Sequence, residues 1–502
     1  MAKDLIIGVD ASTTACKAIV WDKLGNQISS GRSEIPMLRP QTDWHEQQAE
    51  DWWSSLVESL CIATKALNPK RLAGLCICPQ RETFVPVDEA GLPLRNAILW
   101  MDNRARDFLV DLENTLGAEH FHALTGKPPS GNLTLLKIRW LLENEPKIFE
   151  QTSKFLDVAA FLNHKLTGEY ATGWGIGAPA GMFNMKQNNW SSEVLSYLNI
   201  TINQMPAVYP SGAILGYTTP SASRACGLPK GLPIIVGLGD GQAGGLGLNI
   251  TNPGDAYLSL GTSVVSGTFT RCFTTDLAFR TMYAGIPEAY SLETVILGGT
   301  YTIDWLLEKF ARGSQIDQLE SHALQIPPGA EGLMLVPYWN SALTPYWDPS
   351  ARGIVIGWTG NHGPAHLYRA ILEGIAFELR LHFEHIENAL GSKIRRLVIT
   401  GGGSQSDLWC QVIADVIGKM VHRASIAEAT ALGAGILAAF GSGLFPEVLN
   451  AAEAMCAVER DVFTPQSKLH QYYTQLYKGV YRDIFPSVQP LVERLSELSS
   501  RS

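Results

Sequence analysis

The chain has 502 residues, 46% of them hydrophobic and 17% charged, which fits a folded protein of two or three domains and argues against disorder. A formal net charge of -9 offers no basic surface for nucleic acid or for an anionic membrane. We therefore expect a small-molecule partner, no nucleic acid and no membrane, and a homodimer is compatible with these properties.

The first apolar stretch, residues 5–9, is too short for the core of a signal peptide and is followed at once by Asp10. Every later apolar stretch is broken by polar residues well short of the length of a membrane span. We expect a protein that is not exported and that works in the cytoplasm.

Three segments share one pattern, in which a short apolar strand is followed by a turn of small or hydroxylated residues. Residues 5–22 and 256–269 each return as a second strand, which predicts two β-hairpins. Residues 397–417 predict a strand, a glycine loop and an amphipathic helix. Two similar hairpins, half a chain apart, suggest a duplicated fold with a cleft between the copies.

Helices are predicted where apolar residues recur at spacings of three and four, in residues 47–67, 104–116, 135–149 and 367–390. Strands mixed with helices indicate an α/β fold. The stretch 210–233 is rich in Gly, Pro and Ser and leads into a further strand. We place a domain boundary shortly after it, which gives an N-terminal domain of residues 1–250 and a C-terminal domain of residues 251–502.

The turns of the two hairpins contain residues suited to bind a polyphosphate. Small residues let the backbone approach closely, and each hydroxyl adds a hydrogen-bond donor. The residues concerned are Ser12, Thr13, Thr14, Gly261, Thr262 and Ser263. Either turn alone is more typical of an ordinary hairpin, but the repetition in both halves favours phosphate binding.

Three charged residues near these segments are candidates for the chemistry of phosphate. Asp10 ends the first strand, where its carboxylate could hold Mg²⁺ through water, and Lys17 could neutralise phosphate charge. Asp240 lies among glycines, a setting that fits a turn residue and a carboxylate close to a ligand equally well.

A longer set of segments resembles one known family. Residues 353–357, followed by 366–373, match the C-terminal signature of the FGGY carbohydrate kinases. Residues 345–353, 80–83 and 99–104 are similar to segments of glycerol kinases, which belong to that family. The resemblance covers nearly the whole chain. It implies two actin-like (ribonuclease H-like) ATPase domains facing a central cleft, ATP and Mg²⁺ as cofactors, and a small sugar or polyol as the phosphate acceptor.

The resemblance also implies roles for individual residues. Asp240 is implied as the catalytic base and, with Asp10, as a metal ligand. The acceptor is expected to contact Arg81, Glu82, Trp100, Asn132, Asp240 and Gln242. ATP is expected to contact Ser12, Thr13, Thr14, Lys17, Gly261, Thr262, Thr300, Asp304, Gly401, Gly402, Gly403 and Ser406.

Two positions depart from the glycerol kinase pattern. Asn132 stands where glycerol kinases carry a Tyr that packs against glycerol. Gly241 stands where a Gln follows the catalytic Asp, with Gln242 one place later. Both changes predict an acceptor pocket that is larger or more polar, so we expect a ketopentose such as xylulose or a polyol of four or five carbons.

Several alternatives stay open. A glycerol kinase and an autoinducer kinase are alternatives, because both kinds of enzyme share Arg81 and Glu82. A xylulokinase also stays open, because residues 258–263 resemble xylulokinases. A catalytically silent actin-like sugar sensor is an alternative from another class, against which the presence of Asp10 and Asp240 argues.

Residues 428–433 open a further predicted helix beside the nucleotide-binding loop. Their small side chains are typical of close helix packing, which we favour over direct contact with a ligand.

Overall fold

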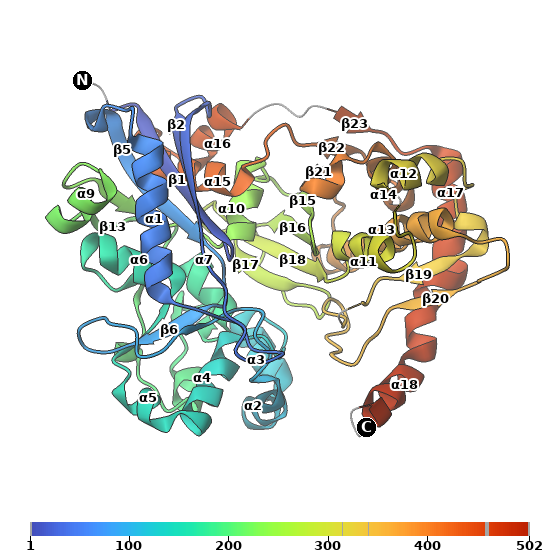
Figure 1. Ribbon diagram of the computed structural model, residues 1–502, viewed down its shortest axis with the longest axis horizontal. Coiled ribbons are helices and arrows are strands. Elements are labelled where there is room, and N and C mark those ends of the chain that lie inside the picture. The colour runs from blue at the N-terminus through green and yellow to red at the C-terminus, as the bar shows by residue number, and fades with distance from the viewer. Residues whose placement is uncertain (1–2, 314, 340, 457–460, 500–502) are drawn as a thin grey trace.

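The computed structural model describes residues 3–313, 315–339, 341–456 and 461–499, which form two α/β halves side by side (Figure 1). The main sheet of the N-terminal half has the strand order β13 (Ile214–Tyr217), β14 (Pro233–Ile235), β5 (Leu72–Pro79), β1 (Leu5–Ala11), β2 (Ala15–Asp22), β3 (Gln27–Glu34). The main sheet of the C-terminal half has the order β17 (Arg280–Tyr283), β18 (Tyr290–Ile296), β16 (Val264–Thr270), β15 (Asp255–Leu260), β21 (Arg396–Thr400), β22 (Val421–Arg423), β23 (Asp461–Phe463).

Smaller sheets accompany the main ones. A second sheet of the N-terminal half has the order β4 (Glu46–Gln47), β7 (Ala97–Ile98), β6 (Phe84–Val87), β8 (Lys154–Asp157). Three strand pairs are β9 (Ala171–Gly173) with β12 (Ala207–Tyr209), β10 (Phe183–Asn184) with β11 (Asn189–Trp190), and β19 (Met334–Val336) with β20 (Ile354–Ile356).

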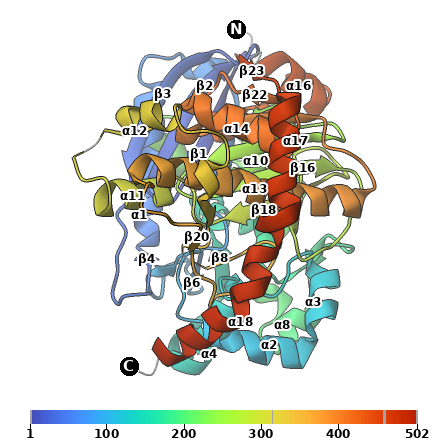
Figure 2. The ribbon, with the colours of Figure 1, turned by 90° about the vertical axis from the view of Figure 1, so that its right-hand side faces the viewer.

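The helices fill the remaining sequence between the strands. Those of the N-terminal half are α1 (Ala49–Thr64), α2 (Leu109–Leu116), α3 (Ala118–Thr125), α4 (Thr134–Asn144), α5 (Pro146–Gln151), α6 (Val158–Thr167), α7 (Trp174–Gly177), α8 (Ser192–Tyr197), α9 (Pro220–Cys226) and α10 (Asp240–Gly247). Those after residue 250 are α11 (Thr300–Lys309), α12 (Ile316–Ala323), α13 (Pro364–Leu390), α14 (Asp407–Ile417), α15 (Ala429–Gly441), α16 (Val448–Met455), α17 (Ser467–Leu476) and α18 (Arg482–Ser499). In both ribbon views, α17 and α18 run along the outer side of the C-terminal half (Figures 1 and 2).

The two main sheets share a core with the same pairing pattern, which confirms the predicted duplication. In the first, β1, β2 and β3 pair antiparallel, while β1, β5 and β14 pair parallel. In the second, β15, β16 and β18 pair antiparallel, while β15, β21 and β22 pair parallel. The two predicted hairpins are therefore the first two strands of each copy, and the strand predicted at residue 397 is β21, the parallel neighbour of β15.

Two helices join the halves. In Figure 1, α10 and α15 lie between the two main sheets, and α15 also packs on β1 and β5. Glycines permit this approach, because a Cβ at Gly433 would collide with the carbonyl of Ala243, and one at Gly8 with the carbonyl of Ala431. The close packing predicted for the small residues of 428–433 is observed at Gly433, and α15, a helix of the C-terminal half, covers the N-terminal sheet.

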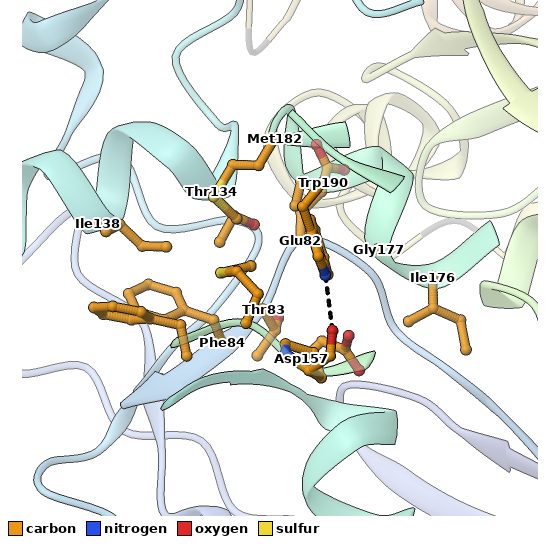
Figure 3. Close-up of a pocket in the computed structure, with 14 residues that line it drawn as sticks. Glu82, Thr83, Phe84, Thr134, Ile138, Asp157, Ile176, Gly177, Met182 and Trp190 are labelled. Carbon is orange, nitrogen blue, oxygen red and sulfur yellow. Dashed lines mark hydrogen bonds between the residues drawn. The ribbon is translucent and has the colours of Figure 1, made fainter. Parts of the chain in front are cut away.

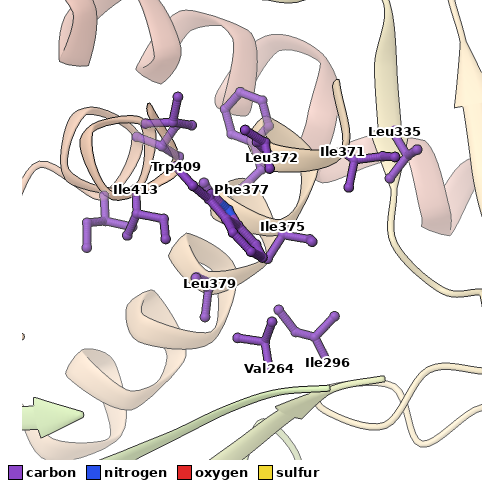
Figure 4. Close-up of a cluster of buried hydrophobic side chains, with 14 of the residues drawn as sticks. Val264, Ile296, Leu335, Ile371, Leu372, Ile375, Phe377, Leu379, Trp409 and Ile413 are labelled. Carbon is purple, nitrogen blue, oxygen red and sulfur yellow. The ribbon is translucent and has the colours of Figure 1, made fainter. Parts of the chain in front are cut away.

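The core of the C-terminal half surrounds α13, which is buried over most of its length. Figure 4 shows Val264 and Ile296 of the sheet facing Ile375 of α13, with Trp409 of α14 packed beside them. Buried charges on α13 have partners, as in the ion pair between Arg369 and Glu373 at 2.8 Å. This packing fixes the sheet that carries the second hairpin.

The predicted helices were confirmed unequally. The predictions for residues 47–67 and 367–390 correspond to α1 and α13, whereas in residues 104–116 only α2 is α-helical, after a 3₁₀ turn. The single helix predicted for residues 135–149 is wrong. The chain breaks between α4 and α5 because Pro146 has no N–H to donate and disfavours a helical residue before it. In the part of the chain that the structure describes, no helix is both long and apolar enough to cross a membrane.

Candidate active site

Asp240 lies at the first position of α10, directly after the N-terminal sheet, and its carboxylate is held by two donors. Arg81 Nε donates to Asp240 Oδ1 at 3.1 Å, and the Gly241 amide donates to the same oxygen at 2.8 Å. The side chain keeps 38% of its surface exposed, so a ligand can reach the second oxygen. Burial of the surroundings raises the pKa of Asp240, and the nearby Arg81 opposes that shift.

Arg81 and Glu82 each form an ion pair with a residue of the C-terminal half, and Arg81 also pairs with Asp240. Arg81 Nη1 lies 2.8 Å from Glu293 Oε2, and Arg280 Nη2 lies 2.5 Å from Glu293 Oε1. Arg280 Nη1 donates to both oxygens of Glu82, at 3.1 and 3.0 Å. Asp240, Arg81, Glu293, Arg280 and Glu82 thus form one chain of alternating charges, which we call the acceptor network.

Sequence reasoning missed Arg280 and Glu293. Both are almost completely buried, with exposed fractions of 5% and 1%. Arg280 is a charge at the start of the buried strand β17, and Glu293 is a charge that interrupts the buried strand β18. Because a charge is rarely buried without a partner, this interruption was the available signal.

The backbone around Glu82 is held in an unusual conformation. Glu82 has a φ of 59°, which is costly for a residue with a side chain. The buried Lys137 of α4 donates to the carbonyls of Glu82, Leu99 and Trp100 at 3.2, 2.8 and 3.1 Å. Burial lowers the pKa of Lys137 to about 8. This lysine therefore ties together the two segments that were predicted to bind the acceptor.

A small pocket of about 20 Å³ lies beside Glu82, Thr83 and Phe84 (Figure 3). Thr134 and Ile138 of α4 also line it. Its volume is close to that of one water molecule, so it adds little room to the acceptor side.

The remaining predicted acceptor residues differ in their surroundings. Trp100 Nε1 donates to Thr13 Oγ1 at 3.0 Å, which links the acceptor side to the first turn. Asn132, just before α4, accepts from Ser130 Oγ at 2.9 Å. Gln242 is buried, and its amide donates to the Gly175 carbonyl at 2.8 Å, so this group holds α10 against α7.

Gly241 does not leave the space that the sequence comparison with glycerol kinases had suggested. A Cβ there would lie 3.3 Å from Glu293 Oε2, 3.3 Å from Tyr257 Oη and 3.4 Å from Arg81 Nη2. The position is thus bordered by polar groups from both halves. Of the two expectations for this site, a pocket that is more polar fits better than one that is larger.

The carboxyl group of Asp10 lies at the base of the first turn, in a buried and acidic environment. Burial raises its pKa to about 7, and the charges of Asp240 and Glu428 add to the shift. Asp10 Oδ1 is buried with no hydrogen-bond partner among the described residues. Lys17 is paired with Glu428, which immediately precedes α15 and which sequence reasoning had assigned to packing.

These carboxylates fit a magnesium ion that also keeps water and phosphate ligands, because Mg²⁺ prefers oxygen and seldom takes an all-protein cage. Within the described residues, no cluster of three or more His, Cys, Asp or Glu side chains is arranged to hold a metal ion. The unpartnered Asp10 Oδ1 and the exposed edge of Asp240 are the protein oxygens suited to such an ion.

The predicted nucleotide residues form a second group, built mainly from backbone. The amide of Thr300 donates to the Gly261 carbonyl at 2.8 Å, and that of Gly299 to the Thr262 carbonyl at 3.0 Å. Gly401 has a φ of 88°, and a Cβ there would lie 2.7 Å from the Leu260 carbonyl oxygen. The turns at residues 261 and 401 therefore lie against each other, with Gly402 open and Gly403 packed on the Trp409 ring.

Hydroxyl groups in the turns are partly used within the protein. Ser12 Oγ donates to the Ala15 carbonyl at 2.9 Å, and Thr13 Oγ1 donates to Gln80 Oε1 at 3.0 Å. Ser406 caps α14 by accepting from the Trp409 amide, and its Oγ donates to Glu320 at 2.7 Å. Thr14 and Asp304 are exposed.

Comparison with known proteins decides the family. Residues 5–247 match the N-terminal domain of the FGGY family of carbohydrate kinases, and residues 256–442 match its C-terminal domain. The chain belongs to the FGGY family of carbohydrate kinases. The boundary predicted near residue 250 falls between the two matched ranges and stays a prediction.

This kinase is similar to other members along its whole length. It is 29% identical to the xylulose kinase of Bacillus subtilis over 476 residues, covering 94% of this chain and 95% of that one. It is 31% identical to the glycerol kinase of Symbiobacterium thermophilum over 479 residues, covering 93% and 95%. The crystal structure of xylulose kinase from Rhodospirillum rubrum matches with a TM-score of 0.92 and 25% identity, covering 97% and 99%. The kinase is thus a sugar-phosphorylating enzyme with the two-domain actin-like fold.

Proposed function

We propose that this kinase transfers the γ-phosphoryl group of ATP to a primary hydroxyl of a ketopentose such as xylulose, or of a polyol with four or five carbons. The observation that carries the proposal is the acceptor network, in which Arg81 contacts Asp240 and is linked through Glu293 and Arg280 to Glu82. Such a site offers both donors and acceptors to neighbouring hydroxyls, next to a carboxylate that can take a proton.

Asp240 acts as the general base on the acceptor hydroxyl. Arg81 and the Gly241 amide both bind its Oδ1, which leaves Oδ2 for the substrate. The hydroxyl proton passes to Asp240 while the new oxygen–phosphorus bond forms and the bond between the β,γ-bridging oxygen and the γ-phosphorus breaks. ADP leaves. Phosphoryl transfer of this kind depends on positioning and charge neutralisation, and it needs no covalent intermediate.

The turns hold the nucleotide. Backbone amides and hydroxyls of Thr13, Thr14, Gly261 and Thr262 bind the phosphates, with the adenosine near Thr300, Asp304, Gly401 to Gly403 and Ser406. Asp10 and Asp240 would hold Mg²⁺, which neutralises phosphate charge when bound. Lys17 would exchange Glu428 for a phosphate oxygen. We place the reaction in the cytoplasm, where a kinase meets ATP.

Glycerol is the second candidate acceptor, because a glycerol kinase is among the relatives and the Arg81–Glu82 motif is shared with glycerol kinases. The polar border at Gly241 favours a longer acceptor, since each additional hydroxyl that finds a buried partner adds about 1 kcal/mol of binding. Gluconate also enters the comparison, because a gluconokinase of Bacillus subtilis is 26% identical over 450 residues.

The test is ADP release by the purified protein with D-xylulose, D-ribulose, erythritol, glycerol and gluconate, with Asp240→Asn as the matched inactive control. We expect kcat/KM for one of the four- or five-carbon acceptors to exceed that for glycerol by about tenfold or more. A preference for glycerol over all the others would overturn the substrate assignment. Absence of release with every acceptor would overturn the proposed function.

A further inference from the structure

We propose that Arg280 and Glu293 are positioning residues that hold Arg81 and Glu82 in their acceptor-binding orientation, so that the C-terminal half completes the acceptor site of the N-terminal half. The inference rests on the proposed function, because it takes Arg81 and Glu82 as the residues that grip the acceptor.

The strand register places these residues on one face of the C-terminal sheet. Arg280 of β17 lies opposite Glu293 of β18, which lies opposite Gly267 of β16. Gly267 in turn lies opposite Tyr257 of β15, whose ring packs against Gly245 of α10. Residues paired across neighbouring strands share a face, so this face is the one turned toward α10 and Asp240.

Glu293 has one oxygen for each arginine. Its Oε1 lies against Arg280 and its Oε2 against Arg81, with 1% of the side chain exposed. Burial alone would raise the pKa of Glu293, but the two guanidinium groups outweigh burial and lower it. The carboxylate is therefore charged, and loss of its charge would leave two buried arginines short of a partner.

Arg280 connects this carboxylate to Glu82. One guanidinium group spans Glu293 and Glu82, which fixes the distance between a residue of the C-terminal sheet and the strained segment at residue 82. Arg81, on the other side of Glu293, ends on Asp240. Both acceptor-binding residues thus depend on one carboxylate that does not itself need to touch the acceptor.

A second contact fastens β17 to the N-terminal half. The buried Lys127, which follows α3, donates to the carbonyl of Thr281 at 2.8 Å and to that of Thr125 at 2.8 Å. Thr281 is the neighbour of Arg280 in β17. The strand that carries Arg280 is therefore held in place independently of the acceptor network.

An ordinary structural ion pair would give a different result from a positioning role. A structural pair stabilises the fold, and its loss lowers stability without singling out one substrate. A positioning pair acts through Arg81 and Glu82, so its loss weakens binding of the acceptor. Binding of the nucleotide is unaffected, because its site is built from other turns.

The test compares Glu293→Gln, Glu293→Asp, Arg81→Gln and the double variant Arg81→Gln with Glu293→Gln. Glu373→Gln serves as the matched control, because Glu373 is another buried carboxylate paired with an arginine of the C-terminal half but has no contact with the acceptor network. Measured are kcat and KM for the best acceptor of the panel, the Kd of ATP by titration calorimetry, and the thermal midpoint.

We expect Glu293→Gln to raise the acceptor KM by about tenfold or more, with the Kd of ATP within about twofold of wild type. Glu293→Asp keeps the charge on a shorter arm, so it should fold like wild type and still raise the acceptor KM. In the Arg81→Gln background, Glu293→Gln should lower kcat/KM by a smaller factor than it does in wild type, because one of the two acceptor-binding residues it acts through is already gone. Glu373→Gln should lower the thermal midpoint only.

Three results would overturn the inference. They are an unchanged acceptor KM in both Glu293 variants, a parallel loss of ATP affinity, or full additivity in the double variant. A wild type that phosphorylates none of the acceptors would overturn the proposed function, and the inference with it. An active wild type beside unaffected Glu293 variants would overturn the inference alone.

Discussion

The proposed acceptor side and the proposed nucleotide side of this kinase are held together by different kinds of contact. On the acceptor side, charged side chains such as Arg81 and Asp240 are held by other charged side chains. On the nucleotide side, the turns at Gly261 and Gly401 meet through backbone atoms. The difference indicates which kind of substitution should impair each side. Changes of charge should damage the acceptor side, and changes of backbone freedom should damage the nucleotide side.

The largest effect is expected on the acceptor side, from Asp240→Asn. The variant keeps the shape of the side chain but cannot take the acceptor's proton, so we expect kcat to fall by about a thousandfold or more. ATP binding should stay within a few-fold of wild type. Single-turnover phosphorylation and calorimetric titration with ATP measure the two effects. Turnover near that of wild type would remove Asp240 from the mechanism.

The nucleotide side should respond to Gly401→Ala. A Cβ at this position meets the backbone of Leu260, and its φ of 88° is strained for any residue except glycine. We expect the Kd of ATP to rise by about tenfold or more, because strain of this kind costs about 1–3 kcal/mol.

Gly402→Ala is the matched control for that change, since a Cβ at Gly402 would have no heavy atom within 4 Å. Its Kd for ATP should rise less than that of Gly401→Ala, because the added methyl group strains no backbone and meets no protein atom. Equal losses of affinity in the two variants would show that the side chain itself, and not backbone strain at Gly401, disturbs the nucleotide.

The same contrast explains what the sequence could predict. The hairpins 5–22 and 256–269 follow from local alternation and turn composition, and both form. The residues of the turns and Asp240 were predicted because a family motif or a glycine-rich turn marks them within a few positions. Local information of this kind suffices for a site made from backbone turns.

The acceptor network could not be predicted in the same way. Arg280 and Glu82 are 198 residues apart in the sequence, and only the docking of β17 and β18 on the N-terminal half brings them together. Arg81 and Glu82 are therefore paired across the halves, with Glu293 and Arg280, which no local motif marks. The break between α4 and α5 is a different kind of miss, because Pro146 was visible in the sequence.

A smaller effect, on stability, is expected from Asp10→Asn in the absence of ligands. The folded pKa of Asp10, about 7, is raised above its ordinary value of 3.8, so the folded protein binds the proton more tightly than the unfolded chain does. Wild type consequently loses stability as the pH rises from about 4 to about 7, and the Asn variant has no such loss. We expect the variant to be more stable than wild type by about 1–3 kcal/mol at pH 8.

Urea unfolding at pH 5 and pH 8 measures that difference for both proteins. The advantage of Asp10→Asn should be small at pH 5 and reach its full size at pH 8. An advantage of the same size at both pH values would mean that the carboxyl group of Asp10 is not the group responsible.

The smallest effect is expected from Asp304→Asn, which tests whether side chains matter on the nucleotide side at all. Asp304 lies on α11, and its side chain is exposed. A hydrogen bond from an exposed group to the nucleotide contributes about 0.5–1.5 kcal/mol at most, because water competes for both partners. The Kd of ATP should therefore rise by less than about tenfold, with the acceptor KM unchanged. Calorimetric titration of both variants with ATP shows whether Asp304→Asn or Gly401→Ala raises the Kd of ATP more. If Asp304→Asn weakens ATP binding more than Gly401→Ala does, the nucleotide side depends on side chains as the acceptor side does. The contrast between the two sides would then be wrong.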